Sequence, residues 1–176
     1  LRSEYADRNT YPTRFIYGQL TSTSGYCADC FNPSLHGNHN IPQVADLNVA
    51  LTNNLTRSLS REELKDVDIQ VLKGVVYISL NDNMLYKSGS YEISPKAGET
   101  LSKIAKIITD YDDYEVLVEG NTDNVPISRQ NIRNNWDLSA LRASSVVQEL
   151  QNKYGVNPSR LSAAGRGEYN TVAEND

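Results

Sequence analysis

The sequence contains very little of the chemistry that most enzymes and metal centres use. In 176 residues there are only two cysteines and two histidines, and all four lie in the first 39 positions. The rest of the chain therefore lacks the side chains for thiol or histidine-assisted catalysis and for a transition-metal cage. No G-x-S-x-G, Walker or dinucleotide-binding motif is present either. We therefore expect no enzyme activity and no cofactor.

The four scarce residues fall together in the segment CADCFNPSLHGNH. They are the candidate metal ligands of the chain: Cys27, Cys30, His36 and His39. Their C-x2-C-x5-H-x2-H spacing is tighter than that of a zinc finger, and a disulfide or a plain linker is favoured over a metal knuckle. We predict that this segment binds no zinc.

Basic residues and long apolar runs are also scarce. Lysine and arginine total 17 against 22 aspartates and glutamates, a formal charge of -5. This balance argues against a nucleic-acid partner, because affinity for nucleic acid comes mainly from basic side chains, and it suits a cationic or zwitterionic ligand. No apolar run approaches the roughly 20 residues that a membrane helix needs. The 39% hydrophobic content supports one core with some polar chain left over.

The first third of the chain divides into two predicted parts. Residues 1–46 are polar and mostly irregular, with Thr13–Thr21 as one candidate strand. Residues 47–66 read as a helical linker, and Ser60 and Glu63 have the spacing of a capping box. One face of this helix is apolar through Leu47, Leu51, Leu55 and Leu59. That leucine face is a candidate surface for self-association.

Residues 67–176 carry the clearest periodic signals and form the predicted main domain. Two β-branched runs around Lys73-Gly74 predict a hairpin over Val67–Leu80. The elements predicted after it are a helix at Ser94–Asp110, a strand at Tyr114–Gly120, a helix at Leu138–Lys153 and a strand at Arg160–Gly165. This order predicts an α+β fold, a βαβαβ mixed sheet with its helices packed on one face.

Two motifs in this domain carry a family resemblance. The turn EGNTDNVPI follows a predicted strand, and NNWDLSALRASSVV opens a predicted helix. Together they resemble the OmpA-like C-terminal domain, the peptidoglycan-binding module of Gram-negative envelopes. That family has a G-H-T-D turn and an N-x-x-L-S-x-x-R-A-x-x-V helix start. The second motif is matched in full by Asn135, Leu138, Ser139, Arg142, Ala143 and Val146. The N-W-x-L-S form looks most like the flagellar-stator and Bacteroides-type envelope branch.

The resemblance covers Val67–Asp176 and includes two departures from the family pattern. Asn121 stands where the family usually has histidine. The family's last strand, which normally closes the sheet, has no counterpart before residue 176. Either the sequence is trimmed or another segment, such as Thr13–Thr21, covers that edge of the sheet.

The resemblance implies a binding site for diaminopimelate of the peptidoglycan stem peptide. Diaminopimelate ends in a zwitterion, whose ammonium suits Asp123 and whose carboxylate suits the planar fork of Arg142. The other implied ligand-binding residues are Asn121, Thr122, Asn124, Asn135 and Leu138. The implied function is non-covalent peptidoglycan binding on the periplasmic side of the envelope. It would anchor the outer membrane, through an anchor outside this chain, or an envelope complex to the cell wall.

Other functions are also compatible with the residues. One is a structural or assembly module of the envelope with a degenerate peptidoglycan cleft. Another is a carboxylate hydrolase of wall polymers that would use Glu115, Glu119 and Asp123. Without the motifs, Asp123 and Arg142 would be taken as a surface ion pair of little energetic value.

Overall fold

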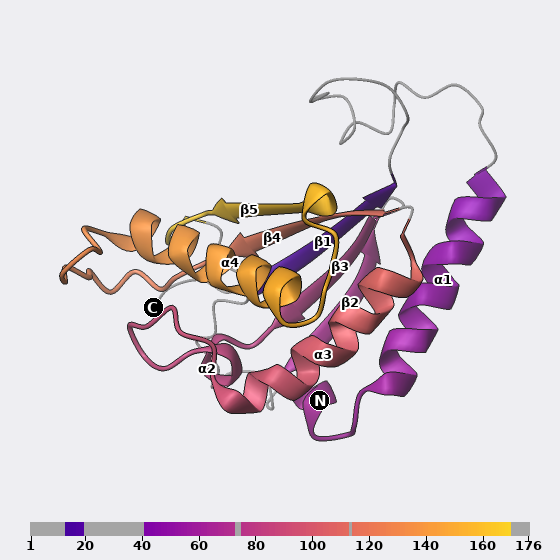
Figure 1. Ribbon diagram of the computed structural model, residues 1–176, viewed down its shortest axis with the longest axis horizontal. Helices are drawn as coiled ribbons and strands as arrows, with labels where there is room; N and C mark the ends of the chain where they lie inside the picture. Colours follow the sequence, from indigo (N-terminus) through magenta and orange to yellow (C-terminus); the bar gives the residue numbers. More distant parts are fainter. Residues whose placement is uncertain (1–12, 20–40, 73–74, 113, 170–176) are drawn as a thin grey trace, which may run out of the picture.

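The computed structural model describes residues 13–19, 41–72, 75–112 and 114–169, and its five strands form one mixed sheet (Figure 1). The strands are β1 (Thr13–Gln19), β2 (Val67–Leu72), β3 (Val75–Leu80), β4 (Tyr114–Gly120) and β5 (Leu161–Gly165). Their order across the sheet is β2-β3-β1-β4-β5. Strands β4 and β5 run parallel, and all other neighbours are antiparallel.

Three long helices cover the same face of this sheet (Figure 1). The long helices are α1 (Ile41–Ser58), α3 (Pro95–Asp110) and α4 (Asn135–Asn152). The shorter elements are the helix α2 (Asp82–Leu85) and the 3-10 turns η2 (Glu63–Lys65) and η3 (Pro158–Arg160). The predicted α+β class is confirmed. Helix α1 begins six residues before the predicted start at 47, and α4 begins three residues before the predicted start at 138. The division into 1–46, 47–66 and 67–176 stays a prediction.

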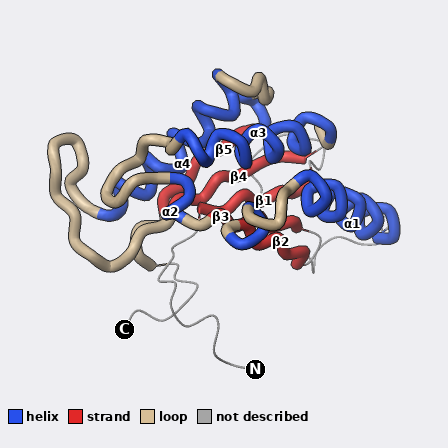
Figure 2. Tube along the Cα trace, turned by 90° about the horizontal axis from the view of Figure 1, so that it is seen from below, coloured by secondary structure: helices blue, strands red, loops and turns tan. Residues whose placement is uncertain are grey.

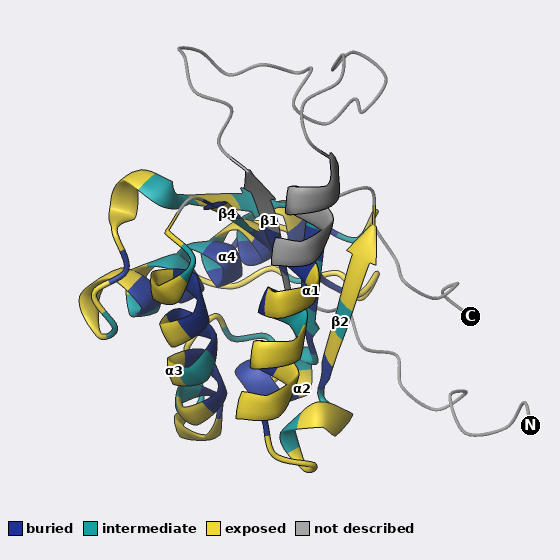
Figure 3. Ribbon diagram, turned by 90° about the vertical axis from the view of Figure 1, so that its right-hand side faces the viewer, coloured by how far each residue is buried: buried dark blue, intermediate teal, exposed yellow. Residues whose placement is uncertain are grey.

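The core lies between the helices and the sheet. Strand β3 shows the expected alternation, with Val76, Ile78 and Leu80 buried. Helix α1 is exposed on its outer side, and its buried side faces inward (Figure 3). Leu51, Leu55 and Leu59 of the leucine face are buried in the chain's own core, while the side chain of Leu47 lies outside the described residues. The predicted self-association through this face is therefore wrong, because these leucines already pack within one chain.

Strand β1 occupies the middle of the sheet. It pairs with β3 on one side and with β4 on the other, so that Phe15 is the register partner of both Ile78 and Val118. Phe15 is fully buried. The strand predicted within Thr13–Thr21 is thus present, and it covers the sides of β3 and β4 that no other described strand pairs with. Strands β2 and β5 form the edges, and β1 connects the two halves of the sheet.

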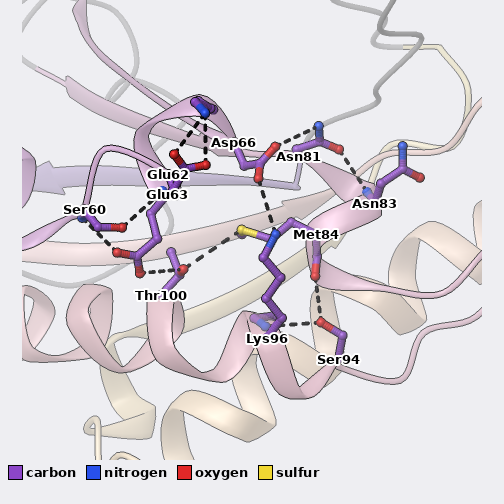
Figure 4. A network of polar contacts seen from close by, with 12 residues as sticks. Ser60, Glu62, Glu63, Asp66, Asn81, Asn83, Met84, Ser94, Lys96 and Thr100 are labelled. Carbon is purple, nitrogen blue, oxygen red and sulfur yellow. Dashed lines mark hydrogen bonds and ion pairs between the residues drawn. The ribbon is translucent and has the colours of Figure 1, made fainter.

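A polar network fixes the start of α3 against the chain that precedes β2 (Figure 4). The predicted capping box is present: Ser60 donates from its main-chain nitrogen to Glu63 Oε2 at 2.8 Å, and Glu63 donates back to Ser60 Oγ at 3.3 Å. Glu63 also accepts from Thr100 at 2.9 Å and Lys103 at 2.6 Å. Burial raises the pKa of Glu63, but these hydrogen bonds outweigh burial and lower the pKa to about 2.

Short caps in the same network hold α2 at the end of β3. The side chain of Asn81 accepts from the main-chain nitrogen of Asn83 and so caps α2. Ser94 caps α3 by accepting from Ala97, and its hydroxyl donates to the carbonyl of Met84 in α2 at 2.7 Å. Figure 4 shows these residues linked to one another. The chain after β3, which includes Asp82, is therefore fixed in place.

Two glycines allow α4 to lie unusually close to the ends of β4 and β5. Gly120 and Gly165 are partners in the parallel pair. A Cβ on Gly120 would lie 2.1 Å from the carbonyl oxygen of Ser139, and one on Gly165 would lie 2.7 Å from the main-chain nitrogen of Ala140. Any side chain here would push the first turns of α4 away from the sheet.

We predict that Gly120→Ala lowers the free energy of unfolding by at least about 2 kcal/mol, because the new Cβ overlaps helix backbone that cannot rotate away. Urea unfolding measures this. The matched control is Gly98→Ala in α3, where a Cβ meets only the far ends of two side chains, at 3.4 and 3.6 Å. That control should be neutral or stabilising by up to about 1 kcal/mol. Equal stability of the Gly120 variant and the parent would contradict the close approach.

Candidate functional site

The candidate site lies at the end of the sheet where the loop 121–134 leaves β4. Figure 2 shows this loop and the loop after α2 at one end of the molecule, with α1 at the opposite end. The two loops touch, since Arg129 donates from Nη1 to the carbonyl of Gly89 at 3.3 Å. The loop after α2 and the loop after β4, which are far apart in the sequence, therefore meet at this end.

Arg142 of α4 is the centre of the site and is only 7% exposed. Its Nη1 forms an ion pair with Asp82 of α2 and a 3.3 Å hydrogen bond to the carbonyl of Asn121. Its Nε donates to the carbonyl of Ser90 at 3.0 Å, and its guanidinium carbon lies 5.0 Å from the centre of the Tyr86 ring. Arg142 therefore joins α4 to both loops.

Asp82 is a largely buried acid, with a side chain that is 13% exposed, and it lies near two charges and a hydroxyl group. Burial raises the pKa of Asp82 to about 7, the positive charge of Arg142 opposes the rise, and the negative charge of Asp123 adds to it. Thr13 of β1 lies near the carboxyl and lowers its pKa, although Oγ1 of Thr13 and Oδ1 of Asp82 have no hydrogen-bond partner among the described residues. Asp82 therefore changes its charge near neutral pH, next to Arg142.

The β4–α4 loop is held by Asn135 in the first turn of α4. The Nδ2 of Asn135 donates to the carbonyls of Asp123 at 3.1 Å and Val125 at 3.2 Å, and to Oε2 of Glu168 at 2.7 Å. The main-chain nitrogen of Thr122 donates to the carbonyl of Gly167 at 2.9 Å. These bonds place the segment after β5 directly against the loop.

Several buried polar atoms of the site have no hydrogen-bond partner among the described residues, including Oδ1 of Asp82 and Oγ1 of Thr13. Two of them lie beside the β4–α4 loop: Oγ1 of Thr122 and Oδ1 of Asn135, in side chains that are 1% and 7% exposed. Buried polar atoms usually have partners, so such atoms in one place indicate room for a bound water or ligand group.

The predicted ligand-binding residues all lie at this end of the sheet, but some of them are buried and others are exposed. The buried ones are Asn121, Thr122, Asn135, Leu138 and Arg142. Asp123 and Asn124 are exposed. A simple surface ion pair between Asp123 and Arg142 is wrong, because Arg142 is buried and its ion-pair partner is Asp82.

Sequence reasoning missed Asp82, Tyr86, Ser90 and Glu168. They lie in two segments, 82–90 and 166–168, to which the motifs EGNTDNVPI and NNWDLSALRASSVV do not extend. Nothing local to those segments shows that they lie against the β4–α4 loop.

Glu115 and Glu119, two of the three carboxylates considered for hydrolysis, do not form a catalytic pair. Glu119 is 2% exposed and accepts from Arg166 at 2.8 Å, whereas Glu115 is exposed. Four residues along one strand separate the two by about 13 Å, which is longer than the separations that glycoside hydrolysis uses.

The candidate zinc ligands Cys27, Cys30, His36 and His39 lie outside the described residues. Within the described residues, no group of three or more His, Cys, Asp or Glu side chains could hold a metal ion. Among those same residues, no helix is both long enough and apolar enough to cross a membrane.

The fold agrees with comparisons to known proteins. The model of the OmpA family matches residues 85–176, just over half of the chain. The chain therefore belongs to the OmpA family, as the motifs predict.

Individual relatives are similar to this chain over about two thirds of its length. Motility protein B of Bacillus subtilis is 26% identical over 136 residues, which are 68% of this chain and 52% of that protein. The chain thus spans about half the length of this curated relative. Among solved structures, the cell wall anchor of the T6SS from Pseudomonas aeruginosa has 25% identity and a TM-score of 0.61, covering 70% of this chain and 83% of its own. The periplasmic domain of Helicobacter pylori MotB has 28% identity and a TM-score of 0.60, covering 66% and 72%.

The raised pKa of Asp82 predicts how stability depends on pH. A carboxyl with a pKa raised from 3.8 to about 7 binds protons more tightly in the folded state. Its contribution to stability is therefore fully present below pH 3.8 and is lost as the pH rises through about 7. We expect Asp82→Asn to remove this fall from the stability profile.

Urea unfolding between pH 4 and pH 8 measures the two profiles. Asp110→Asn, an exposed substitution at the end of α3, serves as the control and should keep the parent's slope. If Asp82→Asn and the parent lose stability in parallel over this range, Asp82 is ionised throughout it and the prediction is wrong.

Proposed function

We propose that this chain binds peptidoglycan non-covalently and anchors an envelope complex to the cell wall. Membership of the OmpA family supports this proposal, as does similarity to a protein described as a cell wall anchor. The observation that carries it is the combination of an exposed Asp123 with a buried Arg142 and two unpartnered polar atoms at one end of the sheet.

The ligand that fits this arrangement is the free end of diaminopimelate in the stem peptide. Its ammonium would lie against Asp123 and against Oδ1 of Asn135, and its carboxylate would accept from Arg142. The hydrogen bonds of Arg142 within the described residues use Nε and Nη1, which leaves Nη2 for the ligand. The hydroxyl of Thr122 can donate to the same carboxylate. Asn124 and Leu138 would complete the polar and apolar walls.

Asp82 competes with the ligand in this proposal. Its carboxylate already occupies Arg142, so a ligand carboxylate must share the guanidinium with it. Protonation of Asp82 weakens its hold on Arg142 and removes a negative charge beside the ligand's own carboxylate. Binding is therefore stronger below pH 7 than above it.

The location follows from the same function. A wall-binding domain of this kind works on the periplasmic side of the envelope, and attachment to the outer membrane would come from an anchor outside this chain.

The second candidate function is an assembly module with a degenerate cleft. Asn121 in place of the family's histidine and the internal pairing of Arg142 favour that alternative.

Sedimentation with purified sacculi tests the proposal. Asp123→Ala removes one charge-assisted contact, a loss of roughly 1.5 to 3 kcal/mol, which is tenfold to over a hundredfold in affinity. Because Asp123 is exposed, the Asp123→Ala variant should have the same thermal stability as the parent protein. Asp110→Ala is the matched control and should sediment normally. If Asp123→Ala sediments as well as the parent, the assembly-module function takes the place of wall binding through this cleft.

Arg142→Ala should also lose binding, but at a cost of about 3 to 5 kcal/mol in stability, because it leaves the carboxyl of Asp82 buried without its partner. Competition therefore supplies a test that needs no variant. Free diaminopimelate should release the protein from sacculi, and Nα-acetyl-lysine amide, whose free end is an ammonium without a carboxylate, should not. Equal release by both compounds would show that the zwitterion is not recognised.

A further inference from the structure

The positive charges near the β4–α4 loop are largely cancelled inside the protein. Arg142 is the cation that would hold the ligand's carboxylate, but its Nη1 already forms an ion pair with Asp82. Two other arginines close to this loop, Arg133 and Arg166, also form ion pairs with carboxylates of the chain. A ligand carboxylate therefore finds little positive charge that is not already matched by a negative one.

Two carboxylates at the same end have no cationic partner among the described residues. They belong to Asp123, which is exposed, and Glu168, which is half-buried. Oε2 of Glu168 accepts from the neutral amide of Asn135 at 2.7 Å, which leaves its negative charge uncancelled. The loop's remaining arginine, Arg129, donates to the carbonyl of Gly89 in the loop after α2. A ligand end with a net positive charge therefore suits this place better than a zwitterion, whose net charge is zero.

The hydrogen-bonding groups of the site include both donors and acceptors. The donors are Nη2 of Arg142 and the hydroxyl of Thr122. Oδ1 of Asn135 and Oδ1 of Asp82 are acceptors that have no partner among the described residues. Asn135 is only 7% exposed, and with Glu168 it lines a hollow of about 490 Å³. Since buried acceptors without a donor are unfavourable, a ligand that brings N–H groups as well as an oxygen satisfies more of the site.

A carboxylate and a primary carboxamide differ in this respect. A carboxylate only accepts hydrogen bonds, whereas a carboxamide accepts through its oxygen and donates through its nitrogen. Next to Arg142 a carboxylate is repelled by the charge of Asp82, but a carboxamide can accept from Arg142 and donate to Asp82. An ammonium alone would suit the charges but would give Arg142 no acceptor. The site therefore favours an ammonium and a carboxamide on the same carbon atom.

We propose that the site selects diaminopimelate whose free-end carboxyl group is amidated, with Asp82 as the residue that determines this specificity. The ammonium lies against Asp123, the carboxamide oxygen accepts from Nη2 of Arg142, and the carboxamide nitrogen donates to Oδ1 of Asp82. The inference rests on the proposed function, because it specifies the chemical form of the peptide that the same site takes.

Protonation of Asp82 should change this selection. The groups around its carboxyl are Arg142 from α4, Asp123 from the β4–α4 loop, Tyr86 after α2 and Thr13 from β1. The ionised carboxyl accepts from a carboxamide and repels a carboxylate, whereas the protonated carboxyl can donate to a carboxylate. Because burial raises the pKa of Asp82 to about 7, the preference for the carboxamide should be present above this pH and fade below it.

Calorimetry with two synthetic stem peptides tests the selection. Both end in diaminopimelate, one with a carboxylate and one with a carboxamide at the free end, and each is titrated into the intact chain. At pH 7.5 we expect the carboxamide peptide to bind about tenfold more tightly, because it loses a repulsion and gains a hydrogen bond to a charged group. Higher pH is avoided, since an α-amino group beside a neutral carbonyl loses its proton at about 7.7 to 8.0. At pH 5.5 the two affinities should lie within about threefold of each other.

Variants test the role of each carboxylate. Asp82→Asn repels no carboxylate, so it should bind the two peptides within about threefold of each other at both pH values. Asp110→Asn makes the same change at an exposed position and should keep the parent's preference and its pH dependence. Glu168→Gln keeps an acceptor for Asn135 but removes a charge, so it should weaken binding of the carboxamide peptide more than binding of the carboxylate peptide. Circular dichroism checks that all three variants are folded.

The possible results separate this inference from the proposed function. Equal affinity for the two peptides in the parent at pH 7.5, or tighter binding of the carboxylate, overturns the selection and leaves the diaminopimelate site in place. A preference that neither Asp82→Asn nor low pH reduces overturns the role of Asp82. If neither peptide binds, the diaminopimelate site fails and the selection fails with it. Should Asp82→Asn not fold, the parent's titrations at the two pH values decide between the same outcomes.

Discussion

The antiparallel pairing of β1 with both β3 and β4 is the interaction on which the rest of the structure depends. It joins the β2–β3 hairpin to the parallel β4–β5 pair. These two halves of the sheet are not neighbours, because β1 lies between them. Each half carries part of the site. Asp82 and Tyr86 follow β3, whereas Asp123 and Arg142 belong to the half built from β4 and α4. The geometry around Arg142 therefore requires β1 to be in place, and Thr13 of β1 contacts Asp82 itself.

Close approach of α4 to the sheet sets the finer geometry. Because Gly120 and Gly165 have no side chains, the first turns of α4 lie directly on the strand ends. Asn135 can then hold the carbonyls of the β4–α4 loop, and Arg142, two turns later, reaches the carbonyl of Asn121. A buried ion pair contributes little net stability, since both charges lose their water. The ion pair with Asp82 is better explained by the way it holds Arg142 in position than by the stability that it provides.

This arrangement suits reversible attachment to a polymer. A site that holds its arginine in an internal pair binds a ligand carboxylate only in competition with Asp82, so the affinity of one site stays modest. A polymeric wall compensates through its many repeats. The proposed contact requires no chemistry on the ligand, and Glu115 and Glu119 lie too far apart along β4 to act as a hydrolytic pair.

Local sequence was sufficient for most elements and for the family. Ser94 and Pro95 predicted the start of α3, and Ser60 with Glu63 predicted their own reciprocal bonds, because caps depend on residues three positions apart. The β-branched runs predicted the hairpin strands for a similar reason. The motif that contains Asn135 and Arg142 predicted which helix carries the site. All of these signals lie within a few residues of the structure that they specify.

Only the tertiary structure decided how distant segments combine. The leucines of α1 have the same spacing whether they pack within one chain or between two, so their burial could not be known from the sequence. The central position of β1 depends on pairing across some 60 to 100 residues, which leaves no local pattern. The pairing of Arg142 with Asp82 and the contact between Trp136 and Tyr169 arise in the same way. By itself the sequence determined the elements, the family and the residue types at the site; the folded sheet decided which charges and rings face one another, because those contacts exist only when separate segments are brought together.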